Sequence, residues 1–278
     1  MKRGHGHAHG HAKKRYGQHF LHDPGTISRI VHAIDPRPGD RIVEIGPGRG
    51  AITAPVLSLA GAIDVVEIDR DVIAPLQTHC QGRGELRVHL ADALEFDFRA
   101  LRGDGPRLRL IGNLPYNVST PLLFHFISQL DAIADMHFML QKEVVVRMAA
   151  APGSGDYGRL TVMLAPHVQV ESLFDIGAGA FKPAPQVTST FFALHPHPRP
   201  PFDVGDPAAF AAVVLAAFSK RRKTLRNSLQ PLLDADGIRA AGVDPGVRAE
   251  TLHPADFAAL ARQWIATRGS AITAVPAE

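Results

Sequence analysis

The chain has 278 residues, which is enough to bury one α/β core and to carry a smaller second unit. Hydrophobic residues make up 45% and charged residues 21%, a composition that excludes a disordered or fibrous chain and indicates a folded globular protein. The formal net charge of +3 is too small to indicate any class of partner.

The first twelve residues form a low-complexity stretch in which His alternates with Gly or Ala at positions 5, 7, 9 and 11. Such a segment has nothing to pack, so we expect a disordered tail over residues 1–13. Clustered imidazoles bind nickel or zinc adventitiously, whereas a functional metal site holds its ligands in one geometry. We therefore expect no functional metal.

Short strand-like segments alternate with helical or turn-rich stretches from Arg41 to Leu140. This alternation predicts a parallel sheet with helices on both faces. Residues 168–174 and 190–194 are expected to extend the same sheet in antiparallel fashion. The expected strands of the parallel part are residues 41–45, 63–67, 86–90, 107–111 and 136–140.

Prolines accumulate between His195 and Pro207, where they stiffen the chain and prevent a helix or a central strand. We place a domain boundary there, with an α/β domain over residues 14–198 and a small α-helical domain over residues 199–278. The Ala- and Leu-rich stretches that predict the helices of the second domain are residues 208–219, 223–233 and 255–267.

Neither a disulfide nor a membrane span is expected. The chain has a single cysteine, Cys80, and its first residues lack the apolar core of a secretory signal. The longest apolar run, residues 208–218, is too short to cross a bilayer. We therefore expect a cytoplasmic protein.

A glycine-rich turn follows the first strand of the parallel sheet. Gly46, Gly48 and Gly50 lie between a strand and a helix, where missing side chains let the backbone approach a ligand closely. The same spacing fits a dinucleotide-binding loop, and Glu67 lies near the position at which an acid holds a nicotinamide ribose. The loop alone therefore leaves open a nicotinamide site, another nucleotide site, or a turn without a ligand.

Acidic residues at two neighbouring strand ends favour an adenosine-containing cofactor. Glu67 follows the second strand and Asp92 the third, at the edge where open α/β sheets bind ligands. Glu67 can accept hydrogen bonds from both ribose hydroxyls, and Asp92 can accept one from the adenine amino group. Either acid alone would be interpreted as a solvent-exposed loop residue, but both together with the loop indicate cofactor binding.

The tetrapeptide Asn113-Leu114-Pro115-Tyr116 follows the fourth strand of the parallel sheet. The amino nitrogen of adenine is a poor nucleophile because its lone pair is delocalised into the ring. The Asn113 side-chain oxygen and the Leu114 carbonyl can accept its two hydrogens and free that pair, while Pro115 keeps the backbone extended. Tyr116 can stack on the base. Standing alone, the tetrapeptide would be interpreted as a turn that closes a strand.

Together these motifs resemble those of the ribosomal RNA adenine dimethylase family over residues 14–266. The segments 17–21, 44–50, 67–69 and 91–94 resemble the family's cofactor-binding motifs, which implies S-adenosylmethionine as cofactor. The family often has asparagine where His19 stands and glycine where Ala91 stands. The resemblance implies a Rossmann-like class I methyltransferase sheet with a small C-terminal α-helical domain. The implied cofactor contacts are Gln18, His19, Leu21, Gly46, Gly48, Glu67, Ile68, Asp92, Ala93 and Asn113.

Phe181 begins a segment, Phe181-Lys182-Pro183-x-Pro185-x-Val187-x-Ser189, that resembles the family's target-base loop. The resemblance implies that Phe181 covers the face of a flipped adenine opposite Tyr116, completing a catalytic set with Asn113 and Leu114. Two stacking faces of about 1 to 3 kcal/mol each offset the few kcal/mol that base extrusion costs. The alternative is that Phe181 simply fills the core.

Residues 217–229 resemble the C-terminal helical segment of the small-subunit enzymes of this family. This implies a substrate of two adjacent adenines in the 3′-terminal hairpin loop of 16S rRNA, each methylated twice, within an assembling small subunit. We expect a monomer. Alternatives are an assembly factor with incidental methylation, a nicotinamide oxidoreductase, or a basic cluster that is only a solvated helix face. This cluster, which would contact phosphates, comprises Lys220, Arg221, Arg222, Lys223 and Arg226.

Overall fold

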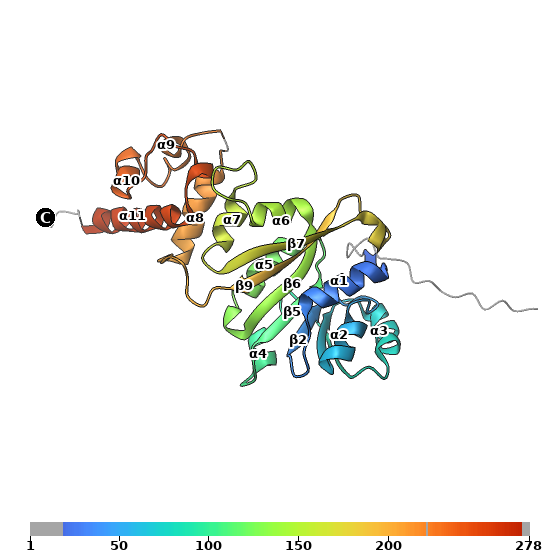
Figure 1. The fold of residues 1–278 in the computed structure, drawn as a ribbon. Helices are drawn as coiled ribbons and strands as arrows, with labels where there is room; N and C mark the ends of the chain where they lie inside the picture. Colours follow the sequence, from blue (N-terminus) through green and yellow to red (C-terminus); the bar gives the residue numbers. More distant parts are fainter. Residues whose placement is uncertain (1–18, 221, 274–278) are drawn as a thin grey trace, which may run out of the picture. The chain divides into compact units, whose positions relative to one another are not determined.

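The computed structural model describes residues 19–220 and 222–273, and side chains only as far as residue 268. The expected tail of residues 1–13, Gln18 and Arg221 lie outside the described residues. Figure 1 shows the order of the elements along the chain.

The chain divides into two compact units. One comprises Met1–Lys142 and Ser172–Ala193, and the other Glu143–Glu171 and Leu194–Glu278. The second unit thus takes in residues 143–171 as well as the C-terminal helices, which the proline-rich stretch did not indicate. The expected domain bounds, 14–198 and 199–278, stay a prediction.

A seven-stranded sheet with the order β4-β3-β2-β5-β6-β9-β7 organises the α/β part. The pairs β2–β3, β2–β5, β3–β4 and β5–β6 are parallel, as the alternating pattern predicts. The two later segments join the same sheet as β7 and β9. The strands are β2 (Ile42–Ile45), β3 (Ala62–Glu67), β4 (Glu85–Leu90), β5 (Leu108–Asn113), β6 (Ile133–Gln141), β7 (Val168–Ile176) and β9 (Ser189–Pro196).

Helices cover both faces of this sheet, as neighbouring residues of β6 show. Met139 packs in one buried cluster with residues of α1, α2 and α3. The adjacent Phe138 stacks on Phe126 of α5, which in turn contacts Phe98 of α4. Successive side chains of a strand point to opposite faces, so the two helix groups lie on opposite sides. The helices are α1 (Pro24–Ile34), α2 (Thr53–Ala60), α3 (Ile73–Cys80), α4 (Phe98–Arg102) and α5 (Ser119–Ile127).

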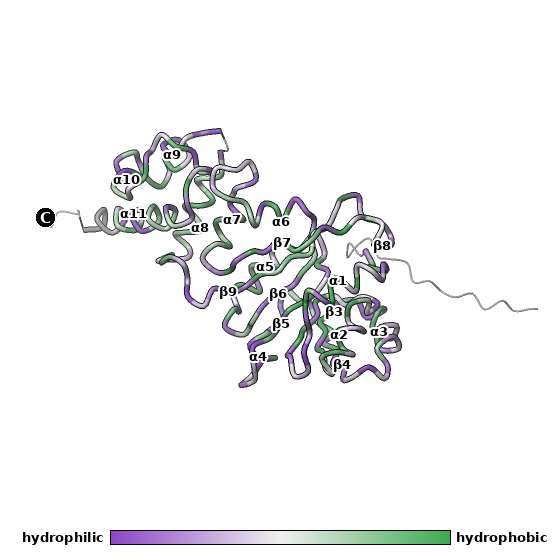
Figure 2. The backbone as a smooth tube through the Cα atoms, viewed as in Figure 1, coloured by the Kyte–Doolittle hydropathy of each residue, from purple (hydrophilic) through white to green (hydrophobic). Residues whose placement is uncertain are grey.

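Local sequence explains why these elements begin and end where they do. The Asp23 side chain accepts a hydrogen bond from the Thr26 backbone NH at 2.7 Å, and Pro24 follows in the first turn, so α1 begins there. All four residues of β2 are buried, which is typical of a central parallel strand. In Figure 2 hydrophobic residues gather along the central strands and α2.

Strands β2, β3 and β5 end together at one edge of the sheet. Ile45 pairs with Val66 on one side and with Gly112 on the other. A Cβ at Gly112 would lie 2.5 Å from the Ile45 carbonyl oxygen, so only glycine allows β5 to approach β2 this closely. The glycine loop starts at this edge, where the Gly46 NH donates to the Val66 carbonyl at 2.9 Å.

A separate two-stranded ladder holds the beginning of the described chain. Strand β1 (Phe20–Leu21) pairs antiparallel with β8 (Phe181–Lys182), so that Phe20 faces Lys182 and Leu21 faces Phe181. The His22 NH adds a hydrogen bond to the Ala180 carbonyl at 2.9 Å. This ladder brings His19 close to a segment that lies 164 residues further along the chain.

The second unit is built from helices around its own apolar cluster, which includes Phe210, Leu229 and Phe257. The Tyr157 hydroxyl donates to the Leu252 carbonyl at 2.8 Å, which ties the inserted segment to the C-terminal helices. The expected middle helix, residues 223–233, is only a four-residue α9. The helices are α6 (Lys142–Met148), α7 (Arg159–Leu164), α8 (Pro207–Phe218), α9 (Leu225–Ser228), α10 (Ala235–Ala240) and α11 (Pro254–Thr273).

Short 3-10 helices lie between these elements: η2 (Arg70–Val72), η3 (Leu130–Ala132), η4 (Ala178–Ala180) and η5 (Ala249–Thr251). Within the described ranges, none of the helices has both the length and the hydropathy that spanning a membrane requires.

Candidate active site

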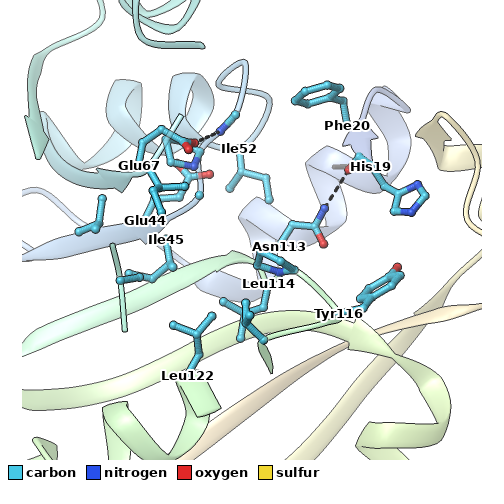
Figure 3. A pocket seen from close by; sticks show the side chains of 18 of the residues that line it. His19, Phe20, Glu44, Ile45, Ile52, Glu67, Asn113, Leu114, Tyr116 and Leu122 are labelled. Atoms are coloured by element: carbon cyan, nitrogen blue, oxygen red, sulfur yellow. Dashed lines mark hydrogen bonds between the residues drawn. The ribbon is translucent and has the colours of Figure 1, made fainter. Parts of the chain in front are cut away.

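One pocket lies at the carboxyl edge of β2, β3, β4 and β5, and it gathers most of the residues that the sequence singled out (Figure 3). Gln18 lies outside the described residues, and Phe181 is absent from the lining. The predicted residues that line it are His19, Leu21, Gly46, Gly48, Glu67, Ile68, Asp92, Ala93, Asn113, Leu114 and Tyr116.

The glycine loop forms the floor of the pocket in a conformation that requires glycine. Gly48 and Gly50 have φ angles of +54° and +86°, in the left-handed region. A Cβ at Gly48 would lie 3.1 Å from the Phe20 ring, and one at Gly50 would lie 2.8 Å from the Leu76 side chain. The Arg49 guanidinium lies over the same Phe20 ring, 4.8 Å from its centroid.

Glu67 closes the loop at the end of β3. Its carboxylate accepts from the Gly48 NH at 3.3 Å (Figure 3). It also accepts from the Asp69 NH at 2.8 Å. Only 5% of the residue is exposed, and this burial raises the pKa of Glu67, while the backbone hydrogen bonds oppose the shift. The carboxylate is therefore held in place and still has lone pairs for the hydroxyls of a ligand.

Glu44, in the middle of β2, is a site residue whose side chain the sequence analysis left without a role. It lines the pocket and is 2% exposed, and its Oε2 is buried without a hydrogen-bond partner in the described structure. Burial raises the pKa of Glu44 to about 8, and the negative charge of Glu67 adds to the shift. An acid inside an otherwise apolar buried strand is the sequence signal that marks it. Such an unsatisfied oxygen favours a ligand that carries hydrogen-bond donors.

Asp92 and its neighbours form the side wall. The Asp92 carboxylate accepts from the Leu94 NH at 2.9 Å, which orients the side chain in a tight turn. Ala93 and Ile68 also line the pocket, and Ile68 is 48% exposed. An apolar surface beside a fixed carboxylate suits a flat heterocycle that has an amino group on its edge.

Asn113 stands at the end of β5 with its side chain fixed by a residue far away in sequence. Its Nδ2 donates to the His19 backbone carbonyl at 3.0 Å. The amide oxygen consequently points away from that carbonyl, on the side of Tyr116 (Figure 3). The Leu114 NH donates to the Met139 carbonyl at 3.2 Å, which anchors the turn to β6.

Tyr116 presents an aromatic face at the mouth of the pocket. Its hydroxyl is 2.7 Å from Ser189 Oγ, and its ring stacks on His19 with the centroids 5.8 Å apart. Burial raises the pKa of Tyr116, and the Ser189 contact opposes the shift. The ring is therefore neutral at physiological pH and held by its polar edge.

The structure does not bring Phe181 into this pocket. The residue is 3% exposed and packs in the apolar cluster with Leu21 and Ile176. Its place in β8, opposite Leu21, turns it into the core. The stacking role that the resemblance implied for Phe181 stays a prediction, and the ring that faces Tyr116 here is His19.

The basic cluster belongs to the helical unit. Lys220, Arg222, Lys223 and Arg226 are exposed. No carboxylate of the described chain forms an ion pair with them. Its contact with phosphates stays a prediction. Metal ligands do not gather anywhere in residues 19–220 and 222–273, where no group of three His, Cys, Asp or Glu side chains could hold an ion.

Comparison with known proteins relates this geometry to a family. The profile of the family described as "Ribosomal RNA adenine dimethylase" matches residues 10–265. "Ribosomal RNA small subunit methyltransferase A" of Methylococcus capsulatus is 52% identical over 251 residues, which cover 90% of this chain and 97% of that protein. The protein of the same name from Pseudomonas aeruginosa is 51% identical over 252 residues, covering 91% and 94%.

Solved structures agree on the architecture. A dimethyladenosine transferase from Plasmodium falciparum superposes with a TM-score of 0.73 at 25% identity, covering 87% of this chain and 96% of that one. The 23S rRNA methyltransferase ErmE superposes with a TM-score of 0.68 at 24% identity, covering 88% and 99%. The second likeness shows the fold alone. The predicted class I methyltransferase fold is thereby confirmed.

Proposed function

Because the chain belongs to the ribosomal RNA adenine dimethylase family, we propose that it transfers methyl groups from S-adenosylmethionine to the exocyclic amino groups of adenines in small-subunit ribosomal RNA. The observation that carries this proposal is the Asn113 amide, whose donor is bound to the His19 carbonyl and whose acceptor is turned to the pocket. The family membership also removes the support for a nicotinamide oxidoreductase, which rested on the loop spacing and the position of Glu67.

The residues of the pocket fit S-adenosylmethionine. Glu67 would hold the ribose hydroxyls and Asp92 the adenine amino group, with Ile68 against the ring. The unpartnered Oε2 of Glu44 is a buried acceptor that would take a donor from the amino acid part, and Gly46, which also lines the pocket, leaves open space where a Cβ would stand. The cofactor supplies an electrophilic methyl carbon on a sulfonium, which leaves a neutral thioether.

The protein's part in the chemistry is to orient the amine. The lone pair of an adenine amino group is delocalised, and two acceptors aimed at its hydrogens favour the pyramidal form in which the pair is free. Asn113 Oδ1 and the Leu114 carbonyl are the proposed acceptors, and Tyr116 the face on which the base stacks. Positioning and fixed dipoles then carry most of the rate, and a strong general base is not needed.

The finer target is also a proposal. Two adjacent adenines in the 3′-terminal hairpin loop of 16S rRNA would each receive two methyl groups, within an assembling small subunit and from a monomeric enzyme. The names of the Methylococcus and Pseudomonas relatives support the small subunit as substrate. The exposed cations of the basic cluster support contacts to phosphate, which position RNA without reading its sequence.

An assay that offers both ribosomal subunits tests the proposal. Small and large subunits without adenine methylation are incubated separately with the chain and S-adenosylmethionine, and digested rRNA is analysed by mass spectrometry. We expect dimethyladenosine in the small-subunit rRNA, on two neighbouring nucleotides. Dimethyladenosine found only in the large-subunit rRNA would show that the large subunit is the substrate. Its absence from both rRNAs would refute the proposed activity.

A further inference from the structure

The loop of residues 91–97, between β4 and α4, forms the side wall of the pocket, and Asp92 and Leu94 line it. Local hydrogen bonds fix the first half of this loop. The Asp92 carboxylate accepts from the Leu94 NH at 2.9 Å, and the Asp92 carbonyl accepts from the Glu95 NH at 3.1 Å. The second half, which begins at Phe96, is held by a residue that follows α5.

Gln129, two residues after the end of α5, makes this second attachment. The residue is 4% exposed, so its amide has to find its hydrogen bonds inside the protein. Its Nε2 donates to the Phe96 carbonyl at 3.1 Å, and its Oε1 accepts from the Phe98 NH at 2.8 Å. His125 Nε2 lies 2.9 Å from the same Phe96 carbonyl. The amide of Gln129 therefore holds the chain on either side of Asp97.

Helix α4 has other anchors, which separate its position from that of the loop. The Arg99 guanidinium pairs with the Asp131 carboxylate at 2.8 Å, and Arg102 donates to the Asp131 carbonyl at 3.0 Å. These contacts do not depend on the side chain at position 129. What Gln129 adds is the contact to Phe96, which fixes the end of the loop.

The helix that precedes Gln129 starts at the catalytic tetrapeptide. The Ser119 hydroxyl, in the first turn of α5, donates to the Tyr116 carbonyl at 3.2 Å, and Leu122 of the same helix lines the pocket (Figure 3). The nine residues of α5 thus join the residues proposed to bind the target amine to the anchor of the cofactor wall. Because both walls are attached to one short helix, we expect them to keep a fixed spacing.

We propose that Gln129 is a positioning residue for the cofactor, which holds the loop of residues 91–97 so that the Asp92 carboxylate meets the amino group of the adenine. Gln129 does not line the pocket, so it acts through the loop and not by touching the ligand. Without the Phe96 contact the loop gains freedom, and Asp92 spends less time at the edge of the adenine. The inference rests on the proposed function, from which it takes the contact between Asp92 and the adenine.

Two substitutions and a matched control test this role. Gln129→Met keeps the length of the side chain and removes both hydrogen bonds. Gln129→Glu keeps an acceptor for the Phe98 NH but replaces the donor to Phe96 by a second acceptor. Tyr157→Phe is the control, because it removes one buried hydrogen bond, to the Leu252 carbonyl, in the other unit.

The readout is the choice between two ligands that differ at the edge of the adenine. Calorimetry at pH 8 gives the affinity of each protein for S-adenosylhomocysteine and for S-inosylhomocysteine, whose ring carries a carbonyl oxygen in place of the amino group. The parent should prefer S-adenosylhomocysteine about 10- to 100-fold, as expected for one hydrogen bond to the charged Asp92. A general loss of stability weakens both ligands alike and leaves this ratio unchanged.

We expect both Gln129 variants to reduce the preference about tenfold, chiefly because S-adenosylhomocysteine binds more weakly. Tyr157→Phe should keep the preference of the parent within about twofold, since it lies in the other unit, although its melting temperature should fall. A cooperative melting transition shows that a variant is folded. If Gln129→Met does not fold, Gln129→Glu decides the question.

Other results overturn the inference. If both Gln129 variants keep the preference of the parent, the amide only joins the helices, and the proposed function is unaffected. A preference kept in Gln129→Glu and lost in Gln129→Met assigns the effect to Phe98 and α4, not to the loop. An equal loss in Tyr157→Phe shows that the ratio follows stability. A parent without any preference removes the Asp92 contact and the inference with it, whereas the assay with ribosomal subunits tests methylation independently.

Discussion

Replacing Asn113 by Ala tests the central geometric claim about the site. The side chain makes one observed hydrogen bond, Nδ2 to the His19 carbonyl at 3.0 Å, and offers Oδ1 to the pocket. Removing a fixed group that acts on the reacting atoms costs about 2.7–4 kcal/mol, which corresponds to about 100- to 1,000-fold in rate. Cofactor affinity should change by no more than several-fold, because most of the implied cofactor contacts lie elsewhere in the pocket.

A second substitution at the same position separates the acceptor from its anchor. Asn113→Asp keeps oxygen acceptors but removes the NH₂ donor, and a carboxylate beside the His19 carbonyl would be repelled. We therefore expect it to be nearly as slow as Asn113→Ala. Asn117→Ala is the matched control, since Asn117 also lines the pocket but is exposed.

Single-turnover methyl transfer at saturating cofactor measures the chemical step directly, and calorimetry gives the cofactor affinity separately. Equal single-turnover rates for Asn113→Ala and the parent would refute the reasoning. So would a rate loss that a matching loss of cofactor affinity fully accounts for, because Asn113 would then be a binding residue only.

The other predictions concern charge. The pKa of Glu44 is raised to about 8, above the value near 4.5 of an ordinary glutamate, so its contribution to stability is full below pH 4.5 and is lost as the pH rises through 8. Measured by urea unfolding, the free energy of unfolding of the parent should fall relative to that of Glu44→Gln by about 1 kcal/mol per pH unit between pH 5 and 8. If the unfolding free energies of the two proteins changed with pH in parallel, the raised pKa of Glu44 would be contradicted. Glu67→Ala should weaken cofactor binding at least about 100-fold, as measured by calorimetry, because hydrogen bonds to a charged group are lost. If cells that carry the Glu67→Ala variant still assembled small subunits normally, an assembly factor with incidental methylation would be favoured. Arg222→Ala should weaken small-subunit binding and lower the salt slope by about 1 with unchanged cofactor affinity, while Arg239→Ala, whose side chain is paired with Asp236, should do neither.

Local patterns were enough to predict the edge of the sheet at which the site lies. Each of these patterns spans only a few neighbouring residues in the sequence. They are the apolar run of β2, the glycines after it, and the acids Glu67 and Asp92 at strand ends. Because parallel strands bring their carboxyl ends together, such local signals converge on one pocket without further information. The residue types of Asn113 and Tyr116 indicated how an adenine amino group could be bound, and the resemblance then implied ribosomal RNA as the substrate.

Long-range contacts account for what the sequence did not predict. The bond from Asn113 to the His19 carbonyl joins residues 94 positions apart, and no periodicity encodes it. Phe181 was expected in a target-base loop because its segment resembles that of the family, but pairing with Leu21 in the β1–β8 ladder turns it into the core. Likewise, the grouping of residues 143–171 with the C-terminal helices depends on tertiary contacts such as that of Tyr157 with Leu252.

The small β1–β8 ladder lies next to His19, whose carbonyl holds the Asn113 amide, so we expect it to influence activity. It consists of two residues on each strand, and short ladders of this kind open far more often than a seven-stranded sheet does. Each opening would withdraw the His19 carbonyl that holds the Asn113 amide, whereas the glycine loop and Glu67 lie outside the ladder. We therefore expect a state in which the cofactor is bound but Asn113 is not held, and hydrogen exchange at the His22 amide, which donates to the Ala180 carbonyl, should report how often this state is visited.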